Sequence, residues 1–328
     1  MARHLIHIGY PKSGSTFLQA WFGRHPELCY APGGLGGFHN VYELGRPPAR
    51  DCVYYVTSFE GLATPHESAG DVRLDFGGAE PEREDRLKEN QAAVCGRLKS
   101  LYPGSRVLVV TRGFRGMILS AYSQSVRMGG RLHLDGMCRE LAARLRRDET
   151  HYYDYDYLLG LYAEAFGEEN LIVLPYELLR DDERAFLSAL EERLGLRHRE
   201  IEIGRVNPSL SPEELYWYPL VSRAVSRAAS RLGPARFRRI YAWYVRRTLD
   251  NRLRPLVRAL ARLRPDARVT DADFPADILG LCAGKATRLR GHPLYTRYAA
   301  EYLLDEGTTP RAELRAAAGR DQPQGGRL

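Results

Sequence analysis

Short apolar runs alternate with segments of helical periodicity along the first half of the chain. The apolar runs predict strands, and they cover residues 5–8, 52–57, 106–111 and 171–175. Segments with apolar residues at helical spacing lie between them, at residues 16–22, 82–100, 114–127, 135–147 and 154–166. This alternation predicts an α/β fold with a mainly parallel central sheet flanked by helices.

The remaining segments have a different character. Residues 31–50 and 61–81 are rich in glycine, proline or polar side chains and predict loops. From about residue 205 the pattern becomes helical and rich in arginine. We expect three parts, which are a core at residues 1–215, a helical arginine-rich region at 216–305 packed on or extending the core, and a disordered tail at 306–328.

Composition places the chain among globular proteins. Of its 328 residues 44% are hydrophobic and 10% are aromatic, which excludes a collagen-like or wholly disordered chain. There is no uninterrupted apolar window of about 18 residues and no signal-peptide pattern at the N-terminus, so we expect a cytoplasmic protein without a membrane span. The five cysteines are widely spaced, without a C-x-x-C pair, and are expected to stay reduced.

Positive charge is concentrated in one region. The formal net charge is +7, and only four of the 48 basic residues are lysines. Between Val221 and Arg268 there are 14 arginines and two aspartates. This arginine belt (residues 221–268) has three interpretations: a solvated charged face, a surface for an anionic membrane, or a site for an anionic acceptor or partner. No nucleic-acid motif accompanies it, so no nucleic-acid partner is expected.

The loop after the first predicted strand has the features of an anion site. It reads I-G-Y-P-K-S-G-S-T-F from Ile8 to Phe17, between a strand and a helix. Such a loop directs backbone N–H groups and the positive end of the helix dipole at one point. It is not a Walker A loop, because the lysine precedes the glycine and no second glycine lies at the required distance. The alternative is a generic turn that happens to contain a lysine.

A second candidate motif follows the strand at residues 106–111. Arg112 comes directly after this strand, and Ser120 lies eight residues later on the next predicted helix. An arginine fork with a hydroxyl suits a terminal phosphate, although a surface arginine and an ordinary helical serine are the alternative. A metal-dependent NTPase would have an aspartate here to help hold magnesium, so we expect a metal-free anion site. Further candidates on the same helix are Arg115, Tyr122, Gln124 and Arg127.

The two motifs together resemble those of sulfotransferases that use 3′-phosphoadenosine 5′-phosphosulfate (PAPS). Y-P-K-S-G-S-T-F is similar to the 5′-phosphosulfate loop of that family, and the arginine–serine pair to its 3′-phosphate site. The resemblance covers about residues 4–215 and is strongest to the bacterial branch. It implies a P-loop-like sulfotransferase fold that takes PAPS as donor and releases PAP. The implied donor-binding residues are Pro11, Lys12, Ser13, Gly14, Ser15, Thr16, Arg112 and Ser120.

Sulfuryl transfer to a hydroxyl requires a base for the acceptor proton. Glu60 ends the segment V-T-S-F-E after the second predicted strand, where a doubly wound sheet gathers functional groups. The resemblance implies a histidine base in cytosolic members, a glutamate in many carbohydrate-directed members, and an S-x-E element in bacterial relatives. We expect Glu60 to be the base, with His39 and His66 as alternatives, and Lys12 to stabilise charge on the leaving phosphate.

The expected function is therefore metal-free, in-line sulfuryl transfer from PAPS to an acceptor hydroxyl. The glutamate favours a carbohydrate or lipid-linked glycan as acceptor, ahead of a small phenolic or other natural product. Two alternatives are a degenerate P-loop kinase and a non-catalytic protein that binds membranes or polyanions through its arginine belt. We also expect a peripheral contact between residues 221–268 and the anionic inner face of the membrane.

Overall fold

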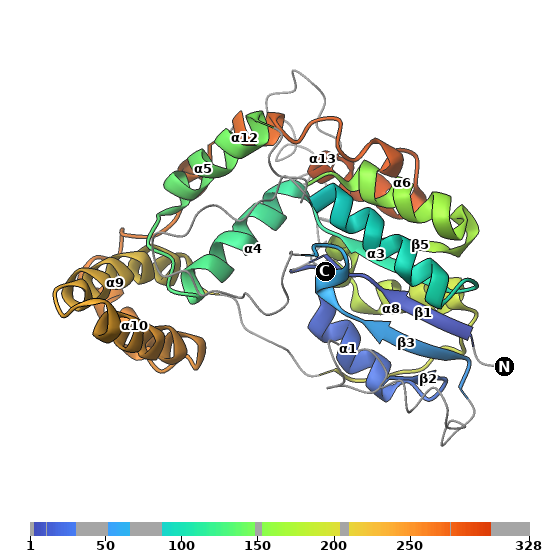
Figure 1. Cartoon of the computed structure of the whole chain (residues 1–328), viewed down its shortest axis with the longest axis horizontal. Coiled ribbons are helices and arrows are strands. Elements are labelled where there is room, and N and C mark those ends of the chain that lie inside the picture. Colours follow the sequence, from blue (N-terminus) through green and yellow to red (C-terminus); the bar gives the residue numbers. More distant parts are fainter. Residues whose placement is uncertain are drawn as a thin grey trace, which may run out of the picture.

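The core of the protein is a parallel sheet. The computed structural model in Figure 1 describes residues 3–10, 12–30, 52–65, 87–147, 153–203, 210–275 and 277–302. Within these ranges the strands are β1 (Arg3–His7), β2 (Leu28–Cys29), β3 (Tyr54–Ser58), β4 (Arg106–Thr111) and β5 (Leu171–Pro175). They pair in parallel in the order β2-β3-β1-β4-β5, which confirms the predicted α/β sheet. Strand β2 has no counterpart in the sequence pattern, because two residues are too few to show a period.

Helices connect the strands and continue beyond them. Those up to residue 203 are α1 (Ser15–Arg24), α3 (Leu87–Leu101), α4 (Phe114–Arg127), α5 (Leu134–Arg146), α6 (Tyr155–Phe166), α7 (Tyr176–Asp181) and α8 (Glu183–Leu194). The later ones are α9 (Pro212–Ser230), α10 (Pro234–Leu249), α11 (Arg254–Leu263), α12 (Asp277–Gly280) and α13 (Ala299–Tyr302). Short 3-10 helices are η2 (Glu60–Leu62), η4 (Glu168–Asn170), η5 (Asp271–Asp273), η6 (Thr287–Leu289) and η7 (Pro293–Tyr298).

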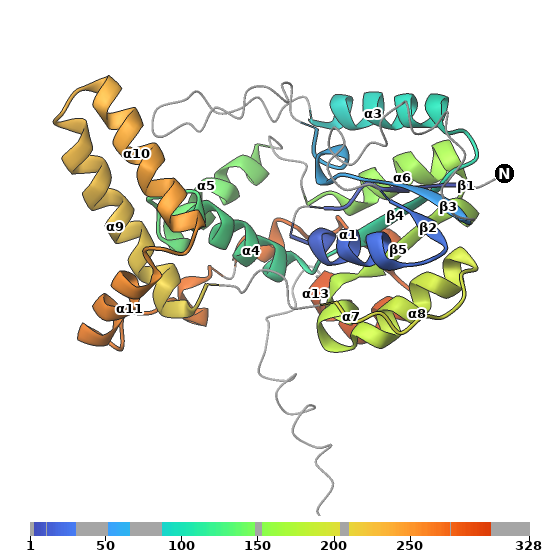
Figure 2. The same cartoon turned by 90° about the horizontal axis from the view of Figure 1, so that it is seen from below.

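Alternate residues of the central strands pack on opposite faces of the sheet. Ile6 and Val107 join the core cluster that includes α3, α4 and α6, whereas Leu5 and Leu108 join the cluster that includes α1 and α8. Figure 2 shows α3 and α6 on one side of the sheet and α1, α7 and α8 on the other. Because neither face meets water, β4 is apolar at every position from Val107 to Val110 rather than alternating.

The strand order brings two distant loops together. β1 and β4 are neighbours, and His7 pairs with Leu108 near their carboxyl ends. The chain leaves β1 for α1 on one face of the sheet and leaves β4 for α4 on the other face. Ligands of open parallel sheets bind where neighbouring connections diverge in this way. The loop after β1 and the turn after β4 therefore lie at the expected ligand-binding edge.

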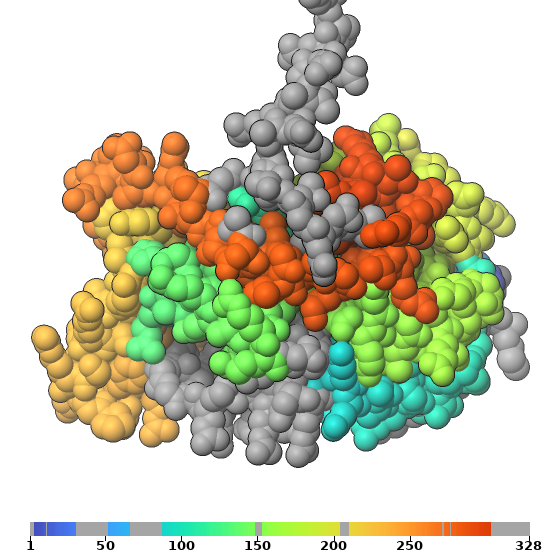
Figure 3. All heavy atoms as spheres, turned by 90° about the horizontal axis from the view of Figure 1, so that it is seen from above, coloured from blue at the N-terminus to red at the C-terminus, as the bar shows by residue number. Residues whose placement is uncertain are grey.

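The C-terminal part begins as a helical region and then returns to the core. In Figures 1 and 2, α9 and α10 lie at the end of the molecule remote from the sheet, with α4 and α5 between. Figure 3 shows the orange-to-red stretch that ends at residue 302 crossing the surface toward α6. There η6 packs on α6, and η7 packs on β5. The boundaries at residues 215 and 305 stay predictions, and the predicted tail at 306–328 lies outside the described residues.

Two expectations from composition can be examined in the described ranges. No helix there is both long enough and apolar enough to cross a bilayer. All five cysteines lie in these ranges, and none of them forms a disulfide.

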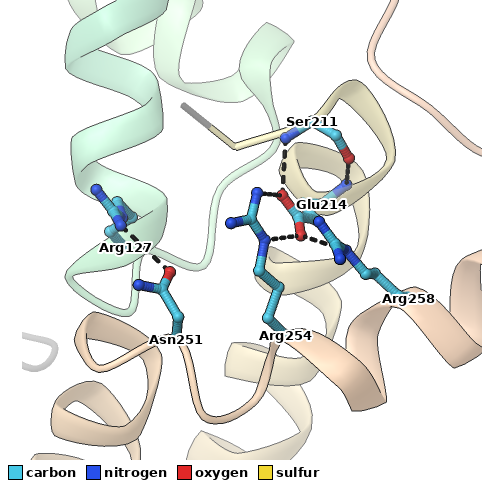
Figure 4. A network of polar contacts seen from close by, with 6 residues as sticks. All are labelled: Arg127, Ser211, Glu214, Asn251, Arg254 and Arg258. Atoms are coloured by element: carbon cyan, nitrogen blue, oxygen red, sulfur yellow. Dashed lines mark hydrogen bonds and ion pairs between the residues drawn. The ribbon is translucent and has the colours of Figure 1, made fainter. Parts of the chain in front are cut away.

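A buried carboxylate joins the first turn of α9 to α11 (Figure 4). Glu214 is 1% exposed and receives hydrogen bonds from the Arg254 and Arg258 side chains and from the Ser211 N–H, at 2.8 Å for the last. The Ser211 hydroxyl accepts from the Glu214 N–H, which completes a capping box. Burial alone would raise the pKa of Glu214, but the Arg254 and Ser211 hydrogen bonds and the charge of Arg258 hold that pKa below its ordinary value.

We predict that Glu214→Gln lowers the free energy of unfolding by about 1–3 kcal/mol at pH 7, because two arginines lose their carboxylate. The folded-state pKa of Glu214 is depressed, so its contribution is present above the unfolded-state pKa and is lost as pH falls through the folded-state value. Denaturant titration across pH 3–7 measures this. An unchanged free energy of unfolding, or an acid-induced loss equal to that of the parent, would contradict the prediction.

Candidate functional site

The two predicted motifs meet at the carboxyl edge of the sheet. Nη1 of Arg112, after β4, donates a hydrogen bond of 2.6 Å to the carbonyl oxygen of Lys12, after β1. The two residues are 100 positions apart in the sequence and come together because their strands are adjacent. One arginine thereby joins the loop to the turn.

The loop after β1 ends at the N-terminus of α1 without a side chain that caps the helix. Lys12 has φ 68° and Gly14 has φ 85°, both in the left-handed region. Gly14 precedes α1 without any side-chain cap, and the first turn of α1 has no acidic residue. The left-handed conformation favours glycine at position 14, and a Cβ there would lie 2.7 Å from Leu179 Cδ2 of α7, so a larger residue would also force that leucine side chain to move. The first N–H groups of α1 therefore lack a side-chain cap.

The serine side chains of this loop are buried. Ser13 and Ser15 are 0% and 2% exposed, and their hydroxyls make no hydrogen bond within the described part of the chain. Thr16, by contrast, is exposed, and Pro11 lies outside the described residues. Buried hydroxyls without partners are unusual in folded proteins, which marks the loop as prepared for further hydrogen bonds.

A buried histidine lies beneath the loop. The Gln19 amide donates to Ser58 Oγ at 3.3 Å, and Ser58 Oγ lies 2.7 Å from Nδ1 of His7. Burial lowers the pKa of His7 to about 3, so its imidazole is neutral. If Ser58 donates to Nδ1, the ring proton is on Nε2. A Cβ on Gly9 would lie 2.7 Å from His7 Nε2 and 2.8 Å from Ser15 Oγ, so both atoms are directed at Gly9.

Hydrogen bonds fix each of the three residues around the Arg112 turn. Tyr155 Oη donates to the Arg112 carbonyl at 2.5 Å, and Thr111 Oγ1 lies 2.7 Å from Tyr295 Oη. The Gly113 N–H donates to Glu177 Oε1 at 3.0 Å, and Tyr302 donates to the other oxygen of Glu177. Glu177, Tyr295 and Tyr302 are at most 1% exposed. The C-terminal segment is therefore part of the support for this turn.

The Arg112 side chain has little freedom. Its guanidinium carbon lies 4.4 Å from the centroid of the Tyr176 ring, in cation–π geometry. On another side it lies against Gly116, where an added Cβ would be 3.1 Å from Nε of the arginine. Ser120 is half-buried and lies one helical turn beyond Gly116 on α4. The Arg112 side chain thus lies against the first turn of α4, and Ser120 lies on the next turn of that helix.

Lys12 lies among other charges. Burial lowers the pKa of Lys12, Glu60 opposes this shift, and Arg127 and Arg112 reinforce it. Glu60 is half-buried and begins η2, directly after β3, whose Ser58 pairs with His7 of β1. The charges of Glu60 and Arg112, which the sequence predicts to be functional, therefore act on Lys12, and so does the charge of Arg127.

Two of the predicted candidates cannot be located. His39 and His66 both lie outside the described residues, so the alternatives to Glu60 stay predictions. In the part of the chain that the structure describes, no group of three or more His, Cys, Asp and Glu side chains is arranged to hold a metal ion.

Several residues of the site have no recognisable signal in the amino-acid sequence. His7 is a single histidine within a strand and belongs to no sequence motif. The only local feature of Glu177 is its position in the first turn of α7. Tyr176 has no local signal either. Tyr295 and Tyr302 are aromatic residues of the C-terminal segment, far along the chain from the motifs. Only their spatial positions reveal the contacts to the Arg112 turn.

Two solved structures of sulfotransferases are similar to this chain. Among solved structures, a sulfotransferase from Alicyclobacillus acidocaldarius matches with a TM-score of 0.41 and 16% identity, covering 73% of this chain and 99% of that one. Mouse sulfotransferase SULT7A1 in complex with PAP matches with a TM-score of 0.36 and 14% identity, covering 60% of this chain and 61% of that one. A search of curated proteins finds no match.

A family model described as "Sulfotransferase family" matches residues 5–200. That range begins in β1 and ends after α8, so it includes the loop after β1, Glu60 and the Arg112 turn. Because the match covers more than half of the chain, the protein belongs to the sulfotransferase family.

Proposed function

We propose that this sulfotransferase uses PAPS as its donor and transfers the sulfuryl group to an acceptor hydroxyl. The observation that carries the proposal is the hydrogen bond from Arg112 to the Lys12 carbonyl, which joins the loop resembling a phosphosulfate site to the motif resembling a 3′-phosphate site. Two anion-binding motifs in contact suit a donor that has anionic groups at both its 5′ and 3′ positions.

The residues present suit such a donor. The uncapped start of α1 offers backbone N–H groups, and the buried Ser13 and Ser15 hydroxyls have unused hydrogen-bonding capacity. Lys12 and Arg112 supply positive charge beside them, and Arg112 is already oriented by Tyr176 and Gly116. We propose that residues 13–16 hold the phosphosulfate and that Arg112 and Ser120 hold the 3′-phosphate.

The chemistry supplied by bound PAPS is a sulfuryl group whose bond to the phosphate oxygen breaks as the acceptor oxygen bonds to sulfur. In this proposal Glu60 accepts the acceptor's hydroxyl proton. Lys12 stabilises negative charge that builds up on the leaving phosphate, with the fixed N–H groups of residues 13–16. The charged groups beside the loop make a metal unnecessary for charge neutralisation.

An oxygen-rich acceptor fits the surroundings of Lys12. Arg127 Nη2 donates to Asn251 Oδ1 at 3.3 Å, but its Nε is buried and has no partner within the described part of the chain. Its charge reaches Lys12, as the effect on the pKa of Lys12 indicates. A guanidinium with unused hydrogen-bonding capacity favours a carbohydrate or lipid-linked glycan over a small phenolic acceptor. We also propose a peripheral contact between the arginine belt and an anionic membrane.

The two alternative functions are a degenerate P-loop kinase and a non-catalytic protein that binds membranes or polyanions. Membership of the sulfotransferase family removes the reason for a degenerate P-loop kinase. A non-catalytic membrane or polyanion-binding protein would still contain the arginine belt, but it would not need the oriented Arg112 side chain. Binding of PAP separates the two cases, because only the catalytic proposal requires it.

We predict that Lys12→Ala and Arg112→Ala each lower transfer of labelled sulfate from PAPS by about 100-fold or more, through lost stabilisation of anionic charge. Arg112→Ala is expected also to weaken PAP binding in calorimetry. The matched controls are Lys99→Ala and Arg97→Ala on α3, which are expected to keep parent activity. Full transfer by either site variant would refute the donor-site assignment.

We predict that Glu60→Gln keeps donor affinity within about 2-fold but lowers turnover by about 100-fold or more, because general-base catalysis is lost. PAP calorimetry and initial rates at saturating PAPS separate the two effects. Glu89→Gln on the exposed face of α3 is the matched control. If Glu60→Gln turns over normally, His39→Ala and His66→Ala identify which alternative base is in use.

We predict that Gly116→Ala weakens PAP binding by about 5- to 30-fold, because the new Cβ displaces the Arg112 guanidinium. Alanine favours the helix by up to about 1 kcal/mol, so thermal stability is expected not to fall in parallel. Gly96→Ala on α3 is the control, since a Cβ there meets nothing within 4 Å. Parent-like PAP affinity in Gly116→Ala would mean that Arg112 does not contact the donor.

A further inference from the structure

Helix α10 has an unusual distribution of charge. Its 16 residues include five arginines and no aspartate or glutamate. Its inner face is apolar, since Tyr241, Tyr244 and Val245 are at most 3% exposed. Tyr241 donates to the Gly129 carbonyl at 2.6 Å and Tyr244 lies 2.8 Å from Ser222 Oγ, so this face is firmly packed. The arginines therefore lie on the faces of α10 that do not pack against the rest of the protein.

One tryptophan lies in the middle of these arginines. Trp243 is 55% exposed, although tryptophan is normally well buried. Arginines occupy the positions seven and four residues before it and three and four residues after it, which places them around it on one helix face. These are Arg236, Arg239, Arg246 and Arg247. The guanidinium carbon of Arg247 lies 5.2 Å from the centroid of a Trp243 ring.

The arginines of this face differ from those of α11 in their ion pairing. None of the five arginines of α10 forms an ion pair with a described residue, whereas Arg254 and Arg258 on α11 share the buried Glu214. Like charges on successive turns of a helix repel one another and destabilise it. An anionic partner would remove that repulsion, so charge complementarity favours an anion-rich surface as the occupant of this face.

Exposed apolar side chains lie beside the arginines and decide the kind of partner. Leu232, which lies just before α10, and Leu249, its last residue, are 48% and 41% exposed. A nucleic acid or a sulfated polymer would pair with the arginines but would leave these leucines in water. The headgroup region of a bilayer accommodates arginine, tryptophan and leucine together.

The position of the helix agrees with such a contact. α10 lies at the end of the molecule remote from the sheet, separated from it by α4 and α5 (Figures 1 and 2). A partner on its outer face would therefore leave the sheet edge that carries Lys12 and Arg112 accessible. No described helix can cross a bilayer, so the contact would be with the surface.

We propose that the outer face of α10, with Trp243 at its centre and the exposed leucines beside it, docks into the headgroup region of an anionic lipid bilayer. The proposal rests on the membrane contact proposed for the arginine belt and is independent of sulfuryl transfer. It assigns the arginines to lipid phosphates and Trp243 to the interface between headgroups and acyl chains.

Co-sedimentation of the full chain with vesicles tests the charge requirement. Binding is expected to phosphatidylcholine vesicles that contain about one third phosphatidylglycerol, to weaken with salt, and to be absent with phosphatidylcholine alone. Arg239→Glu with Arg246→Glu is expected to lower the affinity by about 10-fold or more. Arg97→Glu with Arg184→Glu, which changes the net charge equally on α3 and α8, is expected to bind like the parent. Equal losses in both double variants, or no binding by the parent, would overturn the proposal.

Quenching of tryptophan fluorescence by brominated lipids tests the apolar part. Trp21 is fully buried and Trp217 is only partly exposed, so quenching is expected to come from Trp243 and to disappear in Trp243→Phe. Binding without quenching, together with release by heparin in the parent, would identify a polyanion-binding face and refute bilayer docking. Parallel measurement of PAP binding shows whether the donor site is intact in each variant, so failure of docking and failure of the proposed enzyme function are distinguishable.

Discussion

The hydrogen bond from Arg112 to the carbonyl of Lys12 is the contact on which the candidate site depends. It exists because β1 and β4 are adjacent parallel strands, whose carboxyl ends lie at the same edge of the sheet. Lys12, whose carbonyl accepts this hydrogen bond, has a left-handed conformation, as does Gly14 in the same loop. The link joins the loop to the turn, and we propose that the two together bind the donor.

The support for Arg112 comes from residues far along the chain. Glu177 is a buried carboxylate that needs hydrogen-bond donors, and it takes them from Gly113 and from Tyr302 of the last described helix. Tyr295 adds a contact to Thr111. The family match ends at residue 200, yet part of what orients the site lies a hundred residues later. The C-terminal segment therefore supports the Arg112 turn as well as following the arginine-rich helices.

The arginines of this chain fall into groups with different environments. Arg254 and Arg258 share the single buried carboxylate of Glu214, which joins α11 to α9. Arg112 is held by a carbonyl and an aromatic ring, which orient its charge without cancelling it. The arginines of α10 surround an exposed tryptophan and have no acidic partner among the described residues. The net charge of +7 therefore averages over arginines that share a buried carboxylate, an arginine that we propose binds the donor, and arginines of the outer surface.

The sequence by itself determined the parallel sheet, most helices of the core and the places of the two candidate motifs after β1 and β4, because these features are local. An apolar run such as 107–110 indicates a strand that is buried on both faces of the sheet. A strand, a loop with lysine and glycine, and a helix in succession indicate a helix N-terminus whose backbone N–H groups are available to an anion. Only the tertiary structure decided that Arg112 contacts Lys12, that His7 and Ser15 both lie close to Gly9, that Glu177 accepts from Gly113, and which arginines lack a carboxylate among the described residues. Those relations depend on strand order and on packing between distant segments, which periodicity and spacing along the chain do not encode.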